Sequence, residues 1–140
     1  MFRGILGWIG VGLIVAVVLV LAVYLRDINR AYERVRGKST VISSAYGDIE
    51  YTEGGAGPHV LVIHGSGGGY DQGELIVQAF LSDRFHWIAP SRFGYLGSTF
   101  HDGATFDEQA HAYAALLDHL GVESVAVVAF SHGGPSALLF

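Results

Sequence analysis

An uncharged apolar run near the N-terminus constrains what this chain can fold into more than any other feature of its sequence. Residues 5–25 read ILGWIGVGLIVAVVLVLAVYL and contain no Asp, Glu, Lys or Arg. A helix rises about 1.5 Å per residue, so a run of this length spans roughly 30 Å, the thickness of a bilayer's hydrocarbon core. In lipid the backbone must satisfy its own hydrogen bonds, which a single segment achieves only as a helix. We therefore expect residues 1–26 to form a transmembrane anchor, with the lipid bilayer as the partner of residues 5–25.

A cleaved signal peptide is the alternative explanation of this run. Against it, the run is longer than the roughly 7–15 apolar residues of a signal peptide, and no small-residue cleavage site precedes Arg26. Trp8 and Tyr24 lie near its two ends, where aromatic rings favour the headgroup region. The pattern therefore predicts a single-pass membrane protein.

Charge is distributed unevenly along the chain. Residues 1–40 carry six Lys or Arg against two Asp or Glu, a net charge of +4, whereas residues 41–140 carry two against eleven, a net charge of −9. Most of the basic residues follow the apolar run, so residues 27–38 are predicted to form a basic stem. By the positive-inside rule, the soluble part then lies in the cytoplasm. Because that part lacks the clustered Lys and Arg that a phosphate backbone requires, we expect no nucleic-acid partner.

Several other classes of site are excluded by simple patterns. The chain has no Cys, so it cannot be a disulfide-stabilised scaffold. Residues 37–40 read GKST, the end of a phosphate-binding loop, but the glycine which that motif requires further upstream is replaced by Tyr32. No metal-ligand spacing such as HExxH occurs, and we expect neither a metal nor a cofactor.

The remainder, residues 39–140, alternates between strand and helix patterns. The expected strands are residues 40–44, 48–52, 59–64, 86–89 and 124–130, and the expected helices are residues 71–82, capped by Asp71, and 106–120. The first two strands surround a Tyr-Gly turn and predict a hairpin. Strands that alternate with helices predict an α/β fold, with a parallel sheet behind that hairpin.

A serine follows the last predicted strand. Residues 129–133 read AFSHG and open a helical segment. A Ser between small residues at this point is typical of a nucleophile elbow, a sharp turn that lifts the hydroxyl clear of the sheet. Ala129 departs from the usual first glycine of that motif. An ordinary helix cap is the alternative, and the motif by itself supports both equally.

A glycine-rich loop follows an earlier strand, where residues 64–69 read HGSGGG. Because parallel strands end at the same edge of a sheet, we expect this loop to lie beside Ser131. Glycines allow backbone N–H groups to turn toward a developing oxyanion. The alternatives are an ordinary turn or a phosphate loop, but the sequence lacks the GxGxxG pattern of a dinucleotide site.

With a third motif, PSRFGYLGS at residues 90–98, the chain resembles the α/β-hydrolase fold family over residues 41–140. The resemblance implies Ser131 as the nucleophile, the N–H groups of His132 and of Ser66 or Gly67 as the oxyanion hole, and a structural loop of His64, Gly65 and Gly68. It also implies hydrolysis of an ester, thioester, amide or carbon–carbon bond, because the family's dehalogenases and epoxide hydrolases attack with a carboxylate instead.

The family's order places an acid and a histidine after the nucleophile. The residues after Ser131, HGGPSALLF, contain no Asp or Glu and no His apart from His132, whose side chain an elbow turns away. We therefore expect residues 39–140 to be the N-terminal part of an α/β-hydrolase domain, truncated after the elbow and unable to turn over substrate as it stands. A non-catalytic, membrane-tethered interaction module is the alternative.

The anchor indicates a lipophilic acyl substrate, and the sequence predicts its class no further. Phe93, Tyr95, Leu96 and Phe100 are candidates for lining an apolar pocket, with a core or surface position equally supported.

Overall fold

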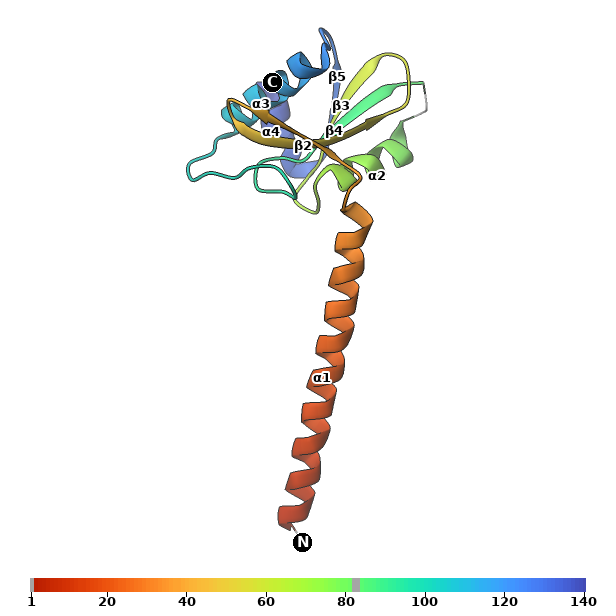
Figure 1. The fold of residues 1–140 in the computed structure, drawn as a ribbon, viewed down its shortest axis with the longest axis vertical. Coiled ribbons are helices and arrows are strands. Elements are labelled where there is room, and N and C mark those ends of the chain that lie inside the picture. Colours follow the sequence, from red (N-terminus) through yellow and green to blue (C-terminus); the bar gives the residue numbers. More distant parts are fainter. Residues whose placement is uncertain (1, 82–83) are drawn as a thin grey trace. The chain divides into compact units, whose positions relative to one another are not determined.

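The computed structural model describes the backbone of residues 2–81 and 84–140 and divides into two compact units, Met1–Arg36 and Gly37–Phe140. The first unit is helix α1 (Phe2–Val35), drawn in red and orange in Figure 1. Its segment Gly7–Val35 is long and apolar enough to cross a membrane: the most apolar 18-residue stretch has a mean hydropathy of 2.8 and contains no buried residue. A signal sequence near an N-terminus satisfies the same criterion of length and composition.

The second unit is built on a five-stranded sheet. Its strands are β1 (Thr40–Ser44), β2 (Gly47–Gly54), β3 (His59–Ile63), β4 (His86–Pro90) and β5 (Ala126–Ala129), in the order β1-β2-β4-β3-β5. The hairpin β1-β2 joins β4 in antiparallel fashion, whereas β4, β3 and β5 are parallel. The helices are α2 (Tyr70–Phe80), α3 (Phe106–Leu120), the 3-10 turn η1 (Ser131–Gly133) and α4 (Gly134–Leu139). The predicted α/β class, a leading hairpin followed by parallel strands with helices, is confirmed.

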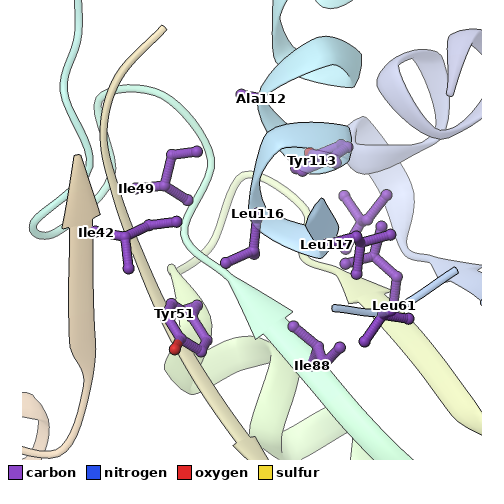
Figure 2. Packing of buried hydrophobic residues seen from close by; sticks show 11 residues of the cluster. Ile42, Ile49, Tyr51, Leu61, Ile88, Ala112, Tyr113, Leu116 and Leu117 are labelled. Carbon is purple, nitrogen blue, oxygen red and sulfur yellow. The ribbon is translucent and has the colours of Figure 1, made fainter. Parts of the chain in front are cut away.

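Strand β3, which lies between β4 and β5, is buried on both faces, as its continuous apolar run predicts. Val60 and Val62 pack in one cluster with residues of α2, whereas Leu61 and Ile63 belong to the cluster on the side of α3. Figure 2 shows the second cluster, in which residues of β1, β2, β3 and β4 meet those of α3. The sheet is therefore covered by helices on both faces, and the loops at its edge start from a well-packed strand.

Helix α3 starts and ends where the sequence predicts. The Thr105 hydroxyl accepts from the Glu108 N–H at 3.1 Å, and the Thr105 N–H donates to the Glu108 carboxylate at 3.0 Å, which forms a capping box. The apolar residues that recur at helical spacing along α3 are buried at Tyr113 and Leu116, but Phe106 is 37% exposed. Phe106 remains partly exposed because it borders a surface pocket described below.

Several element boundaries differ from the sequence predictions by one or two residues, among them those of β5 and α2. Strand β5 is shorter than the predicted 124–130, because its ladder with β3 runs only from Val60 to Ile63. Helix α2 is capped by Gly69, and the predicted cap Asp71 lies in its first turn, where its carboxylate accepts from the Gly69 N–H at 2.8 Å. The predicted end of this helix, at residue 82, lies outside the described residues.

Candidate active site

A strained turn presents Ser131 at the end of β5. Ser131 is exposed and has φ 51°, a left-handed backbone conformation that costs a non-glycine residue about 1–2 kcal/mol. The turn also brings Gly133 against the end of β3, where a Cβ atom would lie 2.6 Å from the His64 carbonyl oxygen and 2.8 Å from Ile63 Cγ2. Only glycine fits at this position, which explains physically why a small residue follows Ser131 at this spacing.

Two buried hydroxyls support this turn from behind. Ser136 Oγ donates to the Gly133 carbonyl at 3.0 Å, so its single proton is used there and the Tyr113 hydroxyl, 3.2 Å away, donates to Ser136. Burial raises the pKa of Tyr113 to about 12, so the phenol keeps its proton at neutral pH. No sequence pattern indicates the polar contact of Tyr113, because that contact depends on Ser136, a partner from another helix.

The glycine loop lies directly beside the elbow. A Cβ atom on Gly65 would lie 3.0 Å from Ser131 Cβ and 3.2 Å from the Phe130 carbonyl oxygen. The two motifs therefore meet at one edge of the sheet, as their places at the ends of parallel strands predict. Gly68 packs on α2 in the same way, with Gln72 Cβ 2.9 Å from the position of its missing side chain.

The backbone N–H groups around Ser131 fall into two kinds. The Gly65 N–H donates to Gln72 Oε1 at 2.7 Å and has no capacity left for a ligand. Within the described part of the chain, the N–H groups of Ser66, Gly67 and His132 donate to no protein acceptor. The amides that the resemblance implies as the oxyanion hole are therefore those without an internal partner.

His64 is completely buried beneath the glycine loop. Its Nε2 accepts from the Arg92 N–H at 2.8 Å, so Nδ1 carries the ring proton and donates to the Gly65 carbonyl at 2.7 Å. The Tyr95 ring packs edge-on against it, with ring centroids 4.8 Å apart. Burial lowers the pKa of His64 to about 4, so it is neutral at pH 7. With both ring nitrogens engaged, it is suited to ordering the loop and not to acting as a base.

A buried carboxylate, which no sequence pattern indicates, holds these loops together. Glu50, on β2, accepts from Ser39 Oγ at 2.7 Å through one oxygen, and from Ser91 Oγ at 2.9 Å and the Gly97 N–H at 2.8 Å through the other. Ser91 Oγ in turn accepts from the N–H of Tyr70, the first residue of α2, at 3.0 Å. Glu50 therefore positions the segment after β4, which holds the start of α2.

The other histidines lie away from the elbow or turn from it. The His132 ring packs edge-on against Phe106, with centroids 5.4 Å apart. His59 and His86 are the first residues of β3 and β4, at the end of these strands away from Ser131, and their ring centroids are 4.9 Å apart. Across residues 2–81 and 84–140, no His or carboxylate hydrogen-bonds the Ser131 hydroxyl. The described residues also contain no group of three or more metal-ligating side chains.

A pocket of about 370 Å³ borders the site on the α3 side. It is lined by Arg92, Phe93, Phe100, Ala104, Thr105, Phe106 and Gln109. Two of the four predicted pocket residues, Phe93 and Phe100, are therefore in its wall. The other two lie elsewhere: Tyr95 packs on His64, and Leu96 lies against Gly69.

Comparisons with known proteins give a consistent result. The sequence profile described as alpha/beta hydrolase fold matches residues 58–140. The chain is 38% identical to the uncharacterized hydrolase YcgS of Bacillus subtilis over 94 residues, 67% of this chain and 33% of that protein. It is 31% identical to haloalkane dehalogenase 2 of Mycobacterium tuberculosis over 104 residues, 72% of this chain and 36% of that protein.

A solved structure shows the same similarity in three dimensions. An alpha/beta hydrolase fold protein from Nakamurella multipartita matches with a TM-score of 0.66 and 41% identity, over 71% of this chain and 34% of that one. The chain thus spans about a third of the length of the relatives that it matches.

Proposed function

Because the chain belongs to the α/β-hydrolase fold family, we propose that it carries the nucleophile and oxyanion hole of a membrane-anchored serine hydrolase. The observation that supports this most directly is the juxtaposition at the sheet edge. Ser131 has a left-handed backbone, is exposed, and packs against Gly65 in a loop whose next two N–H groups have no acceptor within the described residues. A plain helix cap requires none of these three features.

In the proposed reaction Ser131 Oγ attacks a carbonyl carbon and forms an acyl–enzyme, which water then hydrolyses. The carbonyl oxygen gains negative charge and accepts from the N–H of His132 and from that of Ser66 or Gly67. The serine proton passes to a base and then to the leaving group. That base is a His with an acid behind it in the family's order, and the described residues place no such group at the Ser131 hydroxyl.

The residue at the elbow favours acyl substrates over alkyl halides. One relative is named a haloalkane dehalogenase, and the resemblance implies that such enzymes attack with a carboxylate. Ser131 supplies a hydroxyl, which suits attack on an ester, thioester or amide carbonyl. The Phe-lined pocket and the apolar helix α1 both favour a lipophilic acyl group.

Membrane anchoring by α1 completes the proposal. The helix is apolar along the length of a bilayer core and continues into the basic stem. Arg26, Arg30 and Arg34 follow the apolar run, which favours a cytoplasmic position for the second unit. Extraction of native membranes with alkaline carbonate tests this part: we expect the protein to stay in the pellet, and its release into the supernatant would contradict anchoring.

Fluorophosphonate labelling of native membranes, with peptide mapping of the modified residue, tests the enzymatic part. Because fluorophosphonate reacts with a serine that a base activates, we expect the label on Ser131 wherever the native protein supplies that base, and its loss in Ser131→Ala. Ser43→Ala is the matched control, because it removes a hydroxyl from the exposed hairpin, outside the elbow and the glycine loop, so labelling should persist.

Labelling at another residue would contradict the assignment of the nucleophile. A folded protein that never reacts would favour the non-catalytic, membrane-tethered interaction module.

A further inference from the structure

Arg92 is a buried cation for which the structure provides no ionic partner. The second unit is acidic, with Arg84 and Arg92 as the only Lys or Arg among residues 41–140 against eleven carboxylates. Arg92 is only 7% exposed, yet none of the described carboxylates forms a salt bridge with it.

The side chain of Arg92 uses little of its hydrogen-bonding capacity. Nη1 donates to the Gly65 carbonyl at 3.4 Å, a long bond, and Nε has no partner within the described part of the chain. The guanidinium lies 5.5 Å from the centroid of the Tyr95 ring, which offers a weak cation–π contact. A buried guanidinium is unfavourable unless it is paired, and none of the carboxylates in residues 2–81 and 84–140 pairs with it. The arrangement is therefore better explained by a partner that arrives with a ligand.

The surroundings of Arg92 have the character of a small-molecule site. Arg92 lines the pocket of about 370 Å³, a volume near the lower end of ligand pockets, which start at roughly 300 Å³. Phe93, Phe100 and Phe106 supply apolar wall. Gln109 is buried in the same wall, and its Oε1 accepts from the Phe93 N–H at 2.7 Å, which leaves its NH₂ group as a second donor.

Two contacts connect this pocket to the proposed reaction site. Arg92 reaches the carbonyl of Gly65, the glycine that packs against Ser131. Phe106, which also lines the pocket, contacts the ring of His132. The pocket is therefore connected through Arg92 to the glycine loop and through Phe106 to His132, the two segments that supply the proposed oxyanion hole.

We propose that this pocket binds a carboxylate carried by the substrate, apart from the bond to be cleaved. The carboxylate pairs with the Arg92 guanidinium, and the carbon skeleton next to it packs against the three phenyl rings. The substrate class is then an ester, thioester or amide that carries a carboxylate on a short aliphatic or aromatic segment. The naming of this class rests on the proposed function, whereas binding of the carboxylate does not.

A pair of ligands that differ only in charge tests the pocket without catalysis. 3-Phenylpropionate and 3-phenylpropanamide have the same shape, and their binding to the full chain in detergent micelles can be compared by ligand-observed NMR titration. Because charge-assisted hydrogen bonds are the strong ones, we expect the carboxylate to bind about tenfold more tightly or better. Equal binding of the two by the unmodified protein would overturn the proposal and requires no variant.

Matched arginine variants locate the effect. Arg92→Met should abolish the preference for the carboxylate, and Arg92→Lys should retain part of it. Arg84→Met removes the exposed arginine of the same unit and should leave the preference unchanged. A preference that survives in Arg92→Met, or that disappears equally in Arg84→Met, would overturn the assignment.

The two proposals fail separately. Ser131→Ala keeps the pocket, so the carboxylate preference should persist in it. If the preference is present but fluorophosphonate never labels Ser131, the proposed function is wrong and the pocket stands. If Ser131 is labelled but the preference is absent, the pocket proposal is wrong and the hydrolase proposal stands.

Discussion

Histidine and carboxylate side chains are partly exposed at one end of the parallel strands and buried at the other. At the start of β3 and β4, His86 Nε2 lies 2.9 Å from the Glu53 carboxylate, and the two side chains are 30% and 38% exposed. At the other end of β3, His64 is completely buried and hydrogen-bonded through both ring nitrogens. Near that same end, the Glu50 carboxylate is buried and accepts three hydrogen bonds.

This difference shows which end of the sheet is rigid. Breaking a buried hydrogen bond leaves a polar group without water, which costs about 1–3 kcal/mol, whereas an exposed ion pair contributes about 0–1 kcal/mol. The loops around Ser131 are thus held by interactions that cannot exchange with solvent. Backbone N–H groups fixed in this way can stabilise an oxyanion without reorganising.

Lowering the pH should have the largest effect on stability, because it acts on the buried His64 at the Ser131 end of the sheet. The pKa of His64 falls from 6.5 to about 4 on folding. Between these pH values His64 is therefore protonated in the unfolded chain and neutral in the folded one. The contribution of His64 is complete above pH 6.5 and is lost as the pH falls toward 4. At about 1.4 kcal/mol per pKa unit, the loss amounts to roughly 3 kcal/mol. Urea unfolding of the wild type and of His64→Gln at pH 7 and pH 4.5 measures it, and equal pH dependence of the two proteins would contradict this assignment.

Crowding the elbow should have the next largest effect. In Gly133→Ala the new methyl group meets the His64 carbonyl at 2.6 Å, and overpacking of this kind costs about 2 kcal/mol. Labelling of Ser131 should fall with it. Gly134→Ala is the matched control, because nothing lies within 4 Å of its Cβ and its backbone is helical. Equal loss of stability in both variants, measured by urea unfolding, would show that the close approach is not the cause.

Removing the hydroxyl of Ser91 should have a smaller effect. Ser91→Ala deprives the buried Tyr70 N–H of its acceptor and Glu50 of a donor, at a cost of about 1.5 kcal/mol. Ser43→Ala removes a hydroxyl that donates to the Asp48 carboxylate at 2.7 Å on the exposed hairpin. We expect its free energy of unfolding to change by less than about 0.5 kcal/mol. Similar losses in the two variants would argue that burial does not separate these hydrogen bonds.

The exposed end of the sheet should respond least. Glu53→Gln removes the partner of His86, and an exposed pair of this kind changes the free energy of unfolding by less than about 1 kcal/mol. Urea unfolding at low and high salt checks this expectation, because salt screens exposed charges. A loss comparable with that of Ser91→Ala would remove the distinction between the two ends.

Local patterns predicted the elements and the meeting of the two loops. The periodicity of α3 and the continuous apolar run of β3 follow from side-chain geometry within one segment. The proximity of Gly65 and Ser131 followed from the rule that parallel strands end at one edge. The polar network around Glu50 could not be predicted from the sequence, because Glu50 and Ser91 belong to distant segments and neither lies in a pattern that marks it as buried.

The length of β5 is another feature that local sequence patterns did not predict. Its sequence SVAVVAF is apolar over its whole length, but a strand is as long as the ladder it forms, and β3 offers only Val60–Ile63 to pair with it. Likewise, the aromatic residues at 93–100 were recognisable as a group, while their division between pocket and loop depended on where α3 packs.

By itself, the sequence determined the apolar helix, the α/β order of elements, and the two motifs that glycine and serine create where strands end. These features depend on backbone sterics and on hydrophobic period, which neighbouring residues set. The tertiary structure decided the charge state of His64 and the burial of Glu50. It also decided that Arg92 is buried without an ionic partner among the described residues. Each of these depends on which groups surround a side chain and whether water reaches it, and segments far apart in the chain must pack together before either is settled.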